Sequence, residues 1–319
     1  MKKLITLVLV VPAACLIALR AAAILTGVAT IPSFFYGASP LAVVAVLAAG
    51  MASAAFVLGV VTDDYSWVDR LWSTAPVAFA WVYAVRGGLN PRVTVAALLI
   101  TLWGARLTFN FARRGGYTSM EDYRWPILRE RIGNPLFWVL FNFFFICSYQ
   151  VGLFILFTLP VYALSLHPAV PLTTTFTGGA LAFLLFLAYE TVADQQQWDF
   201  QRAKYGVAGD PWPYGPDIQR GFRTTGLFRL SRHPNYFGEL MVWWSIYYLA
   251  AVTGGRLLHW SAIGALLLTL LFIGSTWFTE SITSRKYPDY AEYQRRTSAI
   301  VPWIPAPSPE VDVRIANGE

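Results

Sequence analysis

About eight apolar segments, each long enough to cross a bilayer, dominate this chain of 319 residues. A membrane-spanning helix needs roughly 20 predominantly apolar residues. The composition agrees, because 56% of the residues are hydrophobic and only 13% are charged, about half the charged fraction of a typical soluble domain. We therefore predict an all-α, polytopic helical membrane bundle with about seven to eight transmembrane helices. The expected spans are approximately Leu4–Val28, Pro40–Val61, Trp67–Val85, Val93–Phe111, Pro135–Leu164, Thr173–Asp194, Tyr236–Val252 and Leu257–Phe278.

The basic residues predict how these spans are oriented. Lys and Arg gather in segments 113–131, 202–232 and 285–296 and are nearly absent from the loops at 29–39, 165–172 and 253–256. With an even number of spans, all basic segments fall on one side, which the positive-inside rule makes cytoplasmic. We therefore expect an integral protein of the bacterial inner membrane with both chain ends on the cytoplasmic side.

The two ends of the chain differ from its centre. The first stretch, MKKLITLVLVVPAAC, has the basic start and apolar core of a signal peptide. The apolar run continues past Arg20 to Val28, which favours an uncleaved first helix. The organisation that we expect is N-terminal transmembrane helices at 1–62, one membrane domain at 63–305 and a polar tail at 306–319, which frays.

Polar residues gather at the expected cytoplasmic end. Ionisable groups in or just under a bilayer pair with one another or line a ligand cavity. The arrangement predicts a pocket with a polar half and an apolar half, for a ligand with one charged and one lipid-like part. The segments are DDYSWVDRLW (63–72), WGARLTFNFARRGGYTSMEDYRW (103–125), YETVADQQQWDFQRAKYG (189–206), GLFRLSRHPNYFGEL (226–240) and TESITSRKYPDYAEYQRR (279–296).

The segment GLFRLSRHPNYFGEL contains the densest set of hydrogen-bonding groups. Pro234 suits the first turn of a helix, so Arg232 and His233 stand beside the positive end of the helix dipole. Asn235 and Glu239 are four residues apart and share one helical face, while Gly238 permits a close approach to the backbone. Such a set can hold phosphates, a carboxamide and a ribose. A helix cap with snorkelling arginines is the structural alternative.

Other common sites have no support in the sequence. It contains no GxGxxG after a strand and no GxxxxGK[ST], which excludes a Rossmann domain and a P-loop. The three histidines lack metal-ligand spacing, as do Cys15 and Cys147, so we expect no metal site. The net charge of +6 is accounted for by cytoplasmic loops or an anionic ligand, and we expect no nucleic-acid partner.

These segments resemble those of a known family. GLFRLSRHPNYFGEL and STWFTESITSRKYPDYAEYQRRTSAIVPWIP resemble the C-terminal half of the steroid 5-alpha-reductase family, most closely its bacterial branch. The segments DYSWVDRLWS, LWGARLTFNFARRGGY, EDYRW and ADQQQWDFQ also have counterparts there, so the likeness runs from about Asp63 to Pro305. Sterol C14 reductases and isoprenylcysteine carboxyl methyltransferases share related versions of the RHPNY motif.

The resemblance implies a membrane enzyme that uses NADPH to reduce a carbonyl-conjugated C=C bond in a steroid-like or other lipid substrate, which enters from the bilayer. It places the cofactor on the cytoplasmic side, and the two adjacent arginines of ARRGGY suit its extra phosphate. The cofactor-binding residues that it implies are Arg113, Arg114, Tyr117, Asp194, Gln195, Trp198, Arg202, Arg232, His233, Asn235, Tyr236, Glu239, Glu280, Lys286, Tyr290 and Tyr293.

The catalytic acid is where this chain departs from the animal reductases. Those enzymes meet the steroid ketone with a Gln-Glu pair on an early helix and with a Tyr before the Arg-rich loop. Here the corresponding segments read SWVDRLW and LWGARL, so Asp69 is the candidate acid, with Arg70 as its neighbour. A structural ion pair at Asp69 and Arg70, another Tyr, or water are the alternatives.

Two other functions fit the same sequence. An S-adenosylmethionine-dependent methyltransferase of the isoprenylcysteine type shares the RHPxY motif, but its last cytoplasmic segment tends to carry paired acids, whereas here Ser281 follows Glu280. A non-catalytic lipid-binding protein is the other alternative. The identity of the lipid, the choice of NADPH over NADH and the oligomeric state are open at this stage.

Overall fold

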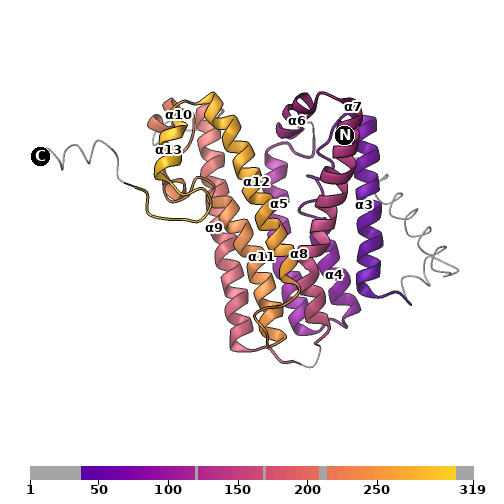
Figure 1. Cartoon of the computed structure of the whole chain (residues 1–319). Coiled ribbons are helices and arrows are strands. Elements are labelled where there is room, and N and C mark those ends of the chain that lie inside the picture. The colour runs from indigo at the N-terminus through magenta and orange to yellow at the C-terminus, as the bar shows by residue number, and fades with distance from the viewer. Residues whose placement is uncertain (1–36, 119–120, 168–169, 208–213, 307–319) are drawn as a thin grey trace, which may run out of the picture. The chain divides into compact units, whose positions relative to one another are not determined.

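The computed structural model of the chain describes residues 37–118, 121–167, 170–207 and 214–306. Every regular element within these ranges is helical (Figure 1), which confirms the predicted all-α class. The elements are α3 (Pro40–Thr62), α4 (Ala75–Arg86), α5 (Pro91–Arg113), α6 (Arg124–Ile132), α7 (Pro135–Phe141), the π-helix η1 (Asn142–Tyr149), α8 (Gln150–Ser165), α9 (Thr174–Lys204), α10 (Gly215–Arg220), the 3-10 helix η2 (Gly226–Arg229), α11 (Pro234–Thr253), α12 (Ala262–Lys286) and α13 (Tyr290–Arg296).

Five helices in the described ranges are long and apolar enough to cross a membrane, which confirms a polytopic helical membrane protein. They are α3, α5, the continuous helix Pro135–Ser165, α9 and α12. Helix α11 has 20 residues, which is about 30 Å and the thickness of a hydrocarbon core. The expected first span, Leu4–Val28, lies outside the described residues.

The expected continuous span Trp67–Val85 is wrong. Residues 63–74 form turns, and the helix α4 that follows has only 12 residues. Helix α3 ends because Asp63 adopts a left-handed conformation with φ 49°, and Pro76 favours a new helix start. The apolar run hid this break, because apolar residues bury equally well in turns and in a helix.

Helices α3, α5 and α7 begin in the same way. In each, a residue with an oxygen-bearing side chain precedes a proline, and that oxygen accepts a hydrogen bond from a backbone N–H two or three residues later. The proline fits because its fixed φ suits the first helical turn and its missing N–H costs nothing there. The pairs are Ser39–Pro40, Asn90–Pro91 and Asn134–Pro135.

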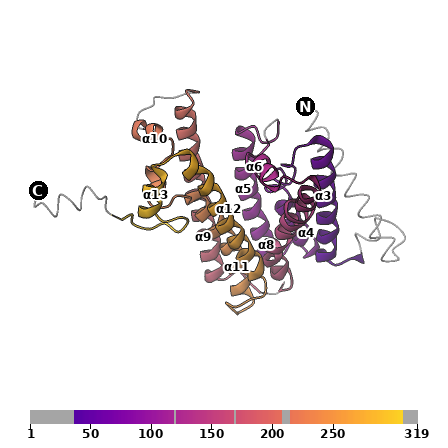
Figure 2. The same ribbon diagram turned by 45° about the horizontal axis from the view of Figure 1, so that its top comes forward.

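The chain forms two compact units. Unit 1 comprises Met1–Ala180 and Ile246–Ala265, and unit 2 comprises Leu181–Ser245 and Leu266–Glu319, so α9, α11 and α12 contribute residues to both. In unit 1, α4 packs against α3, α5 and α8. These four helices run side by side in both views (Figure 1, Figure 2).

The turn segment 63–74 fills the interior of unit 1 beside the long helix Pro135–Ser165. The ring of Tyr65 packs on Trp138 at 4.8 Å, and Trp72 Nε1 donates a 2.9 Å hydrogen bond to Gln150 Oε1. The π-helical turn η1 lies between these two contacts. Such turns are rare and frequently mark functional sites.

Small residues let helices approach closely in both units. A Cβ on Gly264 of α12 would lie 2.1 Å from the carbonyl oxygen of Leu156 in α8, within unit 1. A Cβ on Gly238 of α11 would lie 2.6 Å from the Cβ of Glu190 in α9, within unit 2. Both distances are shorter than van der Waals contact, so a side chain at either glycine forces the helices apart.

We expect Gly264→Ala to destabilise the protein by about 1–3 kcal/mol, because the methyl group meets a backbone that cannot rotate away. The measurement is the apparent melting temperature of the purified protein in detergent. Gly274→Ala is the matched control, because it lies in the same helix and has nothing within 4 Å of the added Cβ. Equal melting temperatures for the two variants would show that α8 and α12 do not pack as described.

Candidate functional site

The N-terminus of α11 is held by a backbone ladder in unit 2. Pro234 is the first helical residue, as the sequence predicts. Just before it, the backbone N–H groups of Arg232 and His233 donate to the carbonyls of Ser298 and Ala299 at 2.8 and 3.0 Å. Trp303 N donates back to the carbonyl of Leu230 at 2.9 Å. The segment after α13 therefore lies along the RHPN motif and fixes it.

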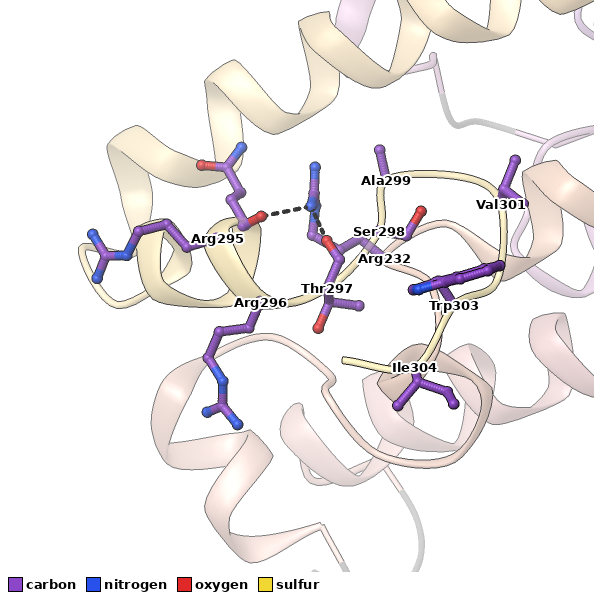
Figure 3. Close-up of a pocket in the computed structure, with 10 residues that line it drawn as sticks. Arg232, Arg295, Arg296, Thr297, Ser298, Ala299, Val301, Trp303 and Ile304 are labelled. Atoms are coloured by element: carbon purple, nitrogen blue, oxygen red, sulfur yellow. Dashed lines mark hydrogen bonds between the residues drawn. The ribbon is translucent and has the colours of Figure 1, made fainter. Parts of the chain in front are cut away.

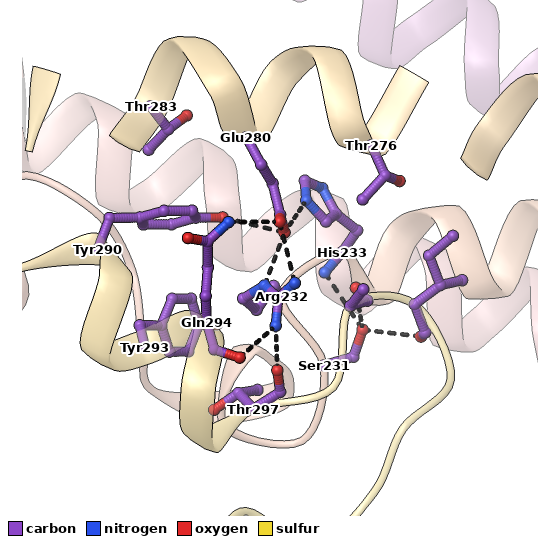
Figure 4. A network of polar contacts seen from close by, with 12 residues as sticks. Ser231, Arg232, His233, Thr276, Glu280, Thr283, Tyr290, Tyr293, Gln294 and Thr297 are labelled. Carbon is purple, nitrogen blue, oxygen red and sulfur yellow. Dashed lines mark hydrogen bonds and ion pairs between the residues drawn. The ribbon is translucent and has the colours of Figure 1, made fainter. Parts of the chain in front are cut away.

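The carboxylate of Glu280 is the centre of a polar network beside this ladder (Figure 4). Arg232 donates to both carboxylate oxygens, from Nε at 2.6 Å and from Nη2 at 2.9 Å. Gln294 Nε2 donates at 2.8 Å, the hydroxyl of Tyr290 lies at 3.3 Å and His233 Nε2 at 3.0 Å. The side chains of Arg232 and Glu280 are each only 9% exposed. The network therefore joins α12, α13 and the start of α11 through one buried charge pair.

Arg232 is largely occupied by the protein itself. Besides Glu280, its Nη1 donates to the backbone carbonyls of Gln294, at 3.0 Å, and Thr297. Four donor contacts thus hold the guanidinium in a fixed plane. This geometry gives Arg232 the role of positioning His233 and the following helix. Only one guanidinium N–H is left for the predicted contact with a phosphate.

The first two turns of α11 meet α9 where Gly238 permits close packing. Asn235 Nδ2 lies 3.4 Å from Asp194 Oδ1, within hydrogen-bond reach. The ring of Tyr236 stacks on His233 at 5.0 Å, and Glu239, which is 5% exposed, accepts a 3.0 Å bond from Trp243 Nε1. The structure therefore brings together Asp194, His233, Asn235 and Tyr236, with Glu239 one turn further along the same helix.

The predicted residues further along α9 are split between faces. Gln195 is exposed and donates a 2.8 Å bond to Asp199, so it points away from the motif. Arg202 lies over the ring of Trp198 at 5.9 Å. Gln196, which the sequence analysis did not select, instead accepts a 2.9 Å bond from Leu227 N in η2. Gln195 and Gln196 are adjacent on α9, so their side chains leave different sides of the helix. The prediction therefore missed the glutamine that bonds η2 by one residue.

The predicted residues of the last segment play packing and polar roles. Tyr290 and Tyr293 are 5% and 9% exposed and pack with Phe222 in a small aromatic cluster. The hydroxyl of Tyr293 donates to the carbonyl of Phe228, so both tyrosines anchor α13. Lys286 is exposed, with its ammonium 5.4 Å from the ring centre of Tyr287.

A groove of about 480 Å³ opens beside the network, between the end of α13 and the segment that follows it (Figure 3). Arg232 is the only predicted site residue among those that line it. Figure 3 shows Arg295 and Arg296 at one side and Trp303 and Ile304 at the other. The lining residues are Arg232, Gln294, Arg295, Arg296, Thr297, Ser298, Ala299, Val301, Trp303 and Ile304.

The predicted catalytic pair lies in the turn segment of unit 1. Asp69 Oδ2 accepts a 2.8 Å hydrogen bond from Trp125 Nε1. Burial and the nearby carboxylate of Asp122 raise the pKa of Asp69 to about 6 from an ordinary value of 3.8. This carboxyl group is therefore partly protonated near neutral pH, as a general acid requires.

Arg70 and Asp69 bond different partners. It is 2% exposed and donates from Nη2 to Asp64 at 2.9 Å and from Nε to the carbonyl of Gly116 at 3.0 Å. The pair therefore ties the turn segment to the ARRGGY loop, and the ion pair that Arg70 forms is with Asp64 rather than Asp69.

The other predicted residues of unit 1 lie around that loop. Arg113 donates to Asn110 Oδ1 from Nε and Nη2 at 2.9 and 2.7 Å, and Arg114 is exposed at the C-cap of α5. The hydroxyl of Tyr117 lies 3.2 Å from Ser73 Oγ. No cluster of metal-ligating side chains occurs in the part of the chain that the structure describes.

Comparison with known proteins decides the family. Residues 55–297 match the family described as "Protein of unknown function (DUF1295)". The chain belongs to this family. DUF1295 is one of the families of the steroid 5-alpha-reductase-like superfamily, so the resemblance seen in the motifs holds at the level of the superfamily.

One curated relative covers most of the chain. The protein is similar to Uncharacterized protein C594.04c of Schizosaccharomyces pombe, with 36% identity over 289 residues that cover 87% of this chain and 84% of the relative. No solved structure matches the chain.

Sequence reasoning missed Gln294 and the acceptor of Arg232. Gln294 lies four residues after Tyr290, so both face Glu280 from one side of α13. The i, i+4 spacing was the available signal for this pair. The pairing of Arg232 with Glu280 joins residues 48 apart, and no local pattern announces it.

We expect Glu280→Gln to destabilise the protein by about 3 kcal/mol or more, because it leaves the buried guanidinium of Arg232 without a counter-charge. The apparent melting temperature in detergent measures the loss. Glu292→Gln is the control, because the Arg295–Glu292 ion pair has exposed fractions of 71% and 37% and contributes at most about 1 kcal/mol. Similar effects of the two variants would contradict the central position of Glu280.

We expect the stability of Asp69→Asn, compared with that of wild type at the same pH, to increase as the pH rises from 5 to 7.5. The folded pKa of Asp69, about 6, lies above the ordinary value of 3.8. The protonated carboxyl group of Asp69 therefore stabilises the folded state fully below about pH 4. This contribution, of up to about 3 kcal/mol, is lost as the pH rises through about 6. Melting curves at several pH values test this, with exposed Asp289→Asn as control. A constant difference between Asp69→Asn and wild type would contradict the raised pKa.

Proposed function

We propose that this DUF1295 protein is a membrane-embedded, NADPH-dependent oxidoreductase that reduces a carbonyl-conjugated C=C bond in a steroid-like or other lipid substrate. One observation carries the proposal. Asp194, His233, Asn235 and Tyr236, which the superfamily resemblance links to the cofactor, gather in unit 2 where α11 begins and packs on α9. Residues 41 apart in the chain meet there, which local structure alone does not require.

Buried polar atoms in the same unit support the fit of a dinucleotide. In the described residues, Tyr189 Oη, Gln197 Oε1 and Thr276 Oγ1 are buried without a hydrogen-bond partner. Each such atom costs about 1–3 kcal/mol if it stays unpaired. Tyr189 packs on Phe237 of α11 at 5.7 Å, and Figure 4 shows Thr276 on α12 beside His233. The hydroxyls and carboxamide of a nicotinamide nucleotide can pair with such groups.

The roles of this chain's residues follow from their chemistry. The Asn235 amide and the Glu239 carboxylate can hold a carboxamide and a ribose hydroxyl, while Arg232 and Glu280 keep the start of α11 in position. Asp69, in unit 1, is the acid that the resemblance implies, and its pKa near 6 is a property that a proton donor needs. When bound, the reduced nicotinamide supplies the hydride.

The membrane-spanning helices support a lipid substrate. Five helices of the described ranges can cross a bilayer, and many of their apolar side chains are exposed on the isolated chain, such as Leu185, Leu270 and Trp277 at 66%, 62% and 75%. A lipid dissolved in the bilayer reaches such an enzyme by lateral diffusion.

The deciding experiment is cofactor binding by the purified protein. We expect NADPH to raise the apparent melting temperature, because a ligand at 100 times its Kd stabilises by about 2.7 kcal/mol. Asn235→Ala and Glu239→Gln should reduce this shift, whereas Glu130→Gln, on the exposed surface of α6, should retain it. Oxidation of NADPH in the presence of lipid enones then tests the reaction.

Three other outcomes would contradict the proposal. A shift with S-adenosylmethionine alone would favour the methyltransferase. A shift with NADPH that survives in Asn235→Ala and Glu239→Gln would place the cofactor elsewhere. The absence of any shift would leave a non-catalytic lipid-binding protein as the best account.

A further inference from the structure

The segment 297–306, which we call the strap, follows α13 and lies along the residues that precede α11. It pairs with residues 230–233 through the backbone bonds of Arg232, His233 and Trp303. Residue 234 is the first of α11, whose 20 residues span about 30 Å, the thickness of the hydrocarbon core. Helix α11 is not among the five candidate spans, so the position of the strap at the membrane interface is part of the proposal below. It is inferred from this length and from the bonds between the strap and the residues directly before the helix.

The strap presents large apolar side chains away from the protein. Val301, Trp303 and Ile304 are 59%, 73% and 82% exposed. The strap is nevertheless fixed, because the Trp303 N–H bonds Leu230 O at 2.9 Å and the Ala306 N–H bonds Arg296 O at 3.0 Å. Tryptophan with aliphatic neighbours at this level is the composition of an interfacial anchor.

The groove beside the strap is positively charged. Its ten lining residues include three arginines and no carboxylate. Glu280 neutralises Arg232 and the exposed carboxylate of Glu292 pairs with Arg295, so the uncompensated charge is that of Arg296, which donates from Nε to the carbonyl of Ala306 at 3.0 Å. Arg295 and Arg296 lie at the opposite side of the groove from Trp303 and Ile304 (Figure 3). Guanidinium groups bind phosphate through paired hydrogen bonds.

We propose that the strap and the end of α13 form a docking site for anionic phospholipid of the adjacent leaflet. Val301, Trp303 and Ile304 enter the boundary between headgroups and acyl chains, and Arg295 and Arg296 bind the headgroup phosphate. The strap carbonyls hold the N–H groups of Arg232 and His233, so lipid that orders the strap also stabilises the start of α11. This proposal does not depend on the reductase activity.

The first test measures how deeply the strap enters the bilayer. A single cysteine at position 301, made by Val301→Cys in a Cys15→Ser, Cys147→Ala background, carries a fluorophore on the full-length protein in nanodiscs. We expect acyl-brominated phosphatidylglycerol to quench it. A label at Asp289→Cys is the control and should be quenched less, because α12 continues six residues beyond Glu280, or about 9 Å. Equal quenching at both positions, or none at 301, would overturn the interfacial position.

The second test measures headgroup selectivity without any label. We expect phosphatidylglycerol to raise the apparent melting temperature at a lower concentration than phosphatidylcholine. Arg295→Gln with Arg296→Gln should weaken the phosphatidylglycerol effect by about fivefold for each charge removed, while Arg129→Gln with Arg131→Gln, the same loss of charge in unit 1, should not. Equal effects of the two lipids on wild type, or equal losses in the two double variants, would overturn the anionic-lipid site.

Discussion

The arrangement of unit 2 depends on the contacts that the Glu280 carboxylate makes. This carboxylate accepts contacts from Arg232 and His233, just before α11, and from Tyr290 and Gln294 of α13. A buried carboxylate is stable only when its charge is paired and its lone pairs are filled. This need is satisfied by side chains from separate elements, so the folding of each element depends on the placement of the others.

Unit 1 uses the same device. Arg70 and Asp64 form an ion pair with side chains 1% and 4% exposed, and Arg70 also reaches the carbonyl of Gly116. The pair holds a turn segment inside a bundle of apolar helices, where apolar contacts alone would not select one conformation. Breaking such a pair by removing one partner is costly, although replacing both partners by apolar groups is often neutral. Conformational specificity is therefore the better account of these pairs than stability.

The sequence predicts much of the fold and part of the candidate site. Apolar runs of membrane-spanning length predicted most of the long helices, and Pro234 predicted where α11 begins, because both signals are local. The break at 63–74 escaped prediction, since its buried residues, such as Trp67 and Val68, are as apolar as those of a span. The inward turn of Gln196 and the pairing of Arg232 with Glu280 also escaped, because they depend on helical register and on contacts far apart in the chain.

The arginines of this chain show why a basic cluster is an ambiguous sign of phosphate binding. Arg70 and Arg232 are held by buried carboxylates, Arg113 by Asn110 and Arg202 by the face of Trp198. A guanidinium in such a setting fixes the backbone and retains little capacity for a ligand. In the proposed reductase, recognition in unit 2 falls mainly to groups such as Asn235, Tyr189 and Thr276, which select a ligand by hydrogen-bond geometry. Groups of this kind can bind only the neutral parts of a nucleotide, so the proposal makes affinity for the whole cofactor depend on how rigidly the charged pairs hold these groups in place.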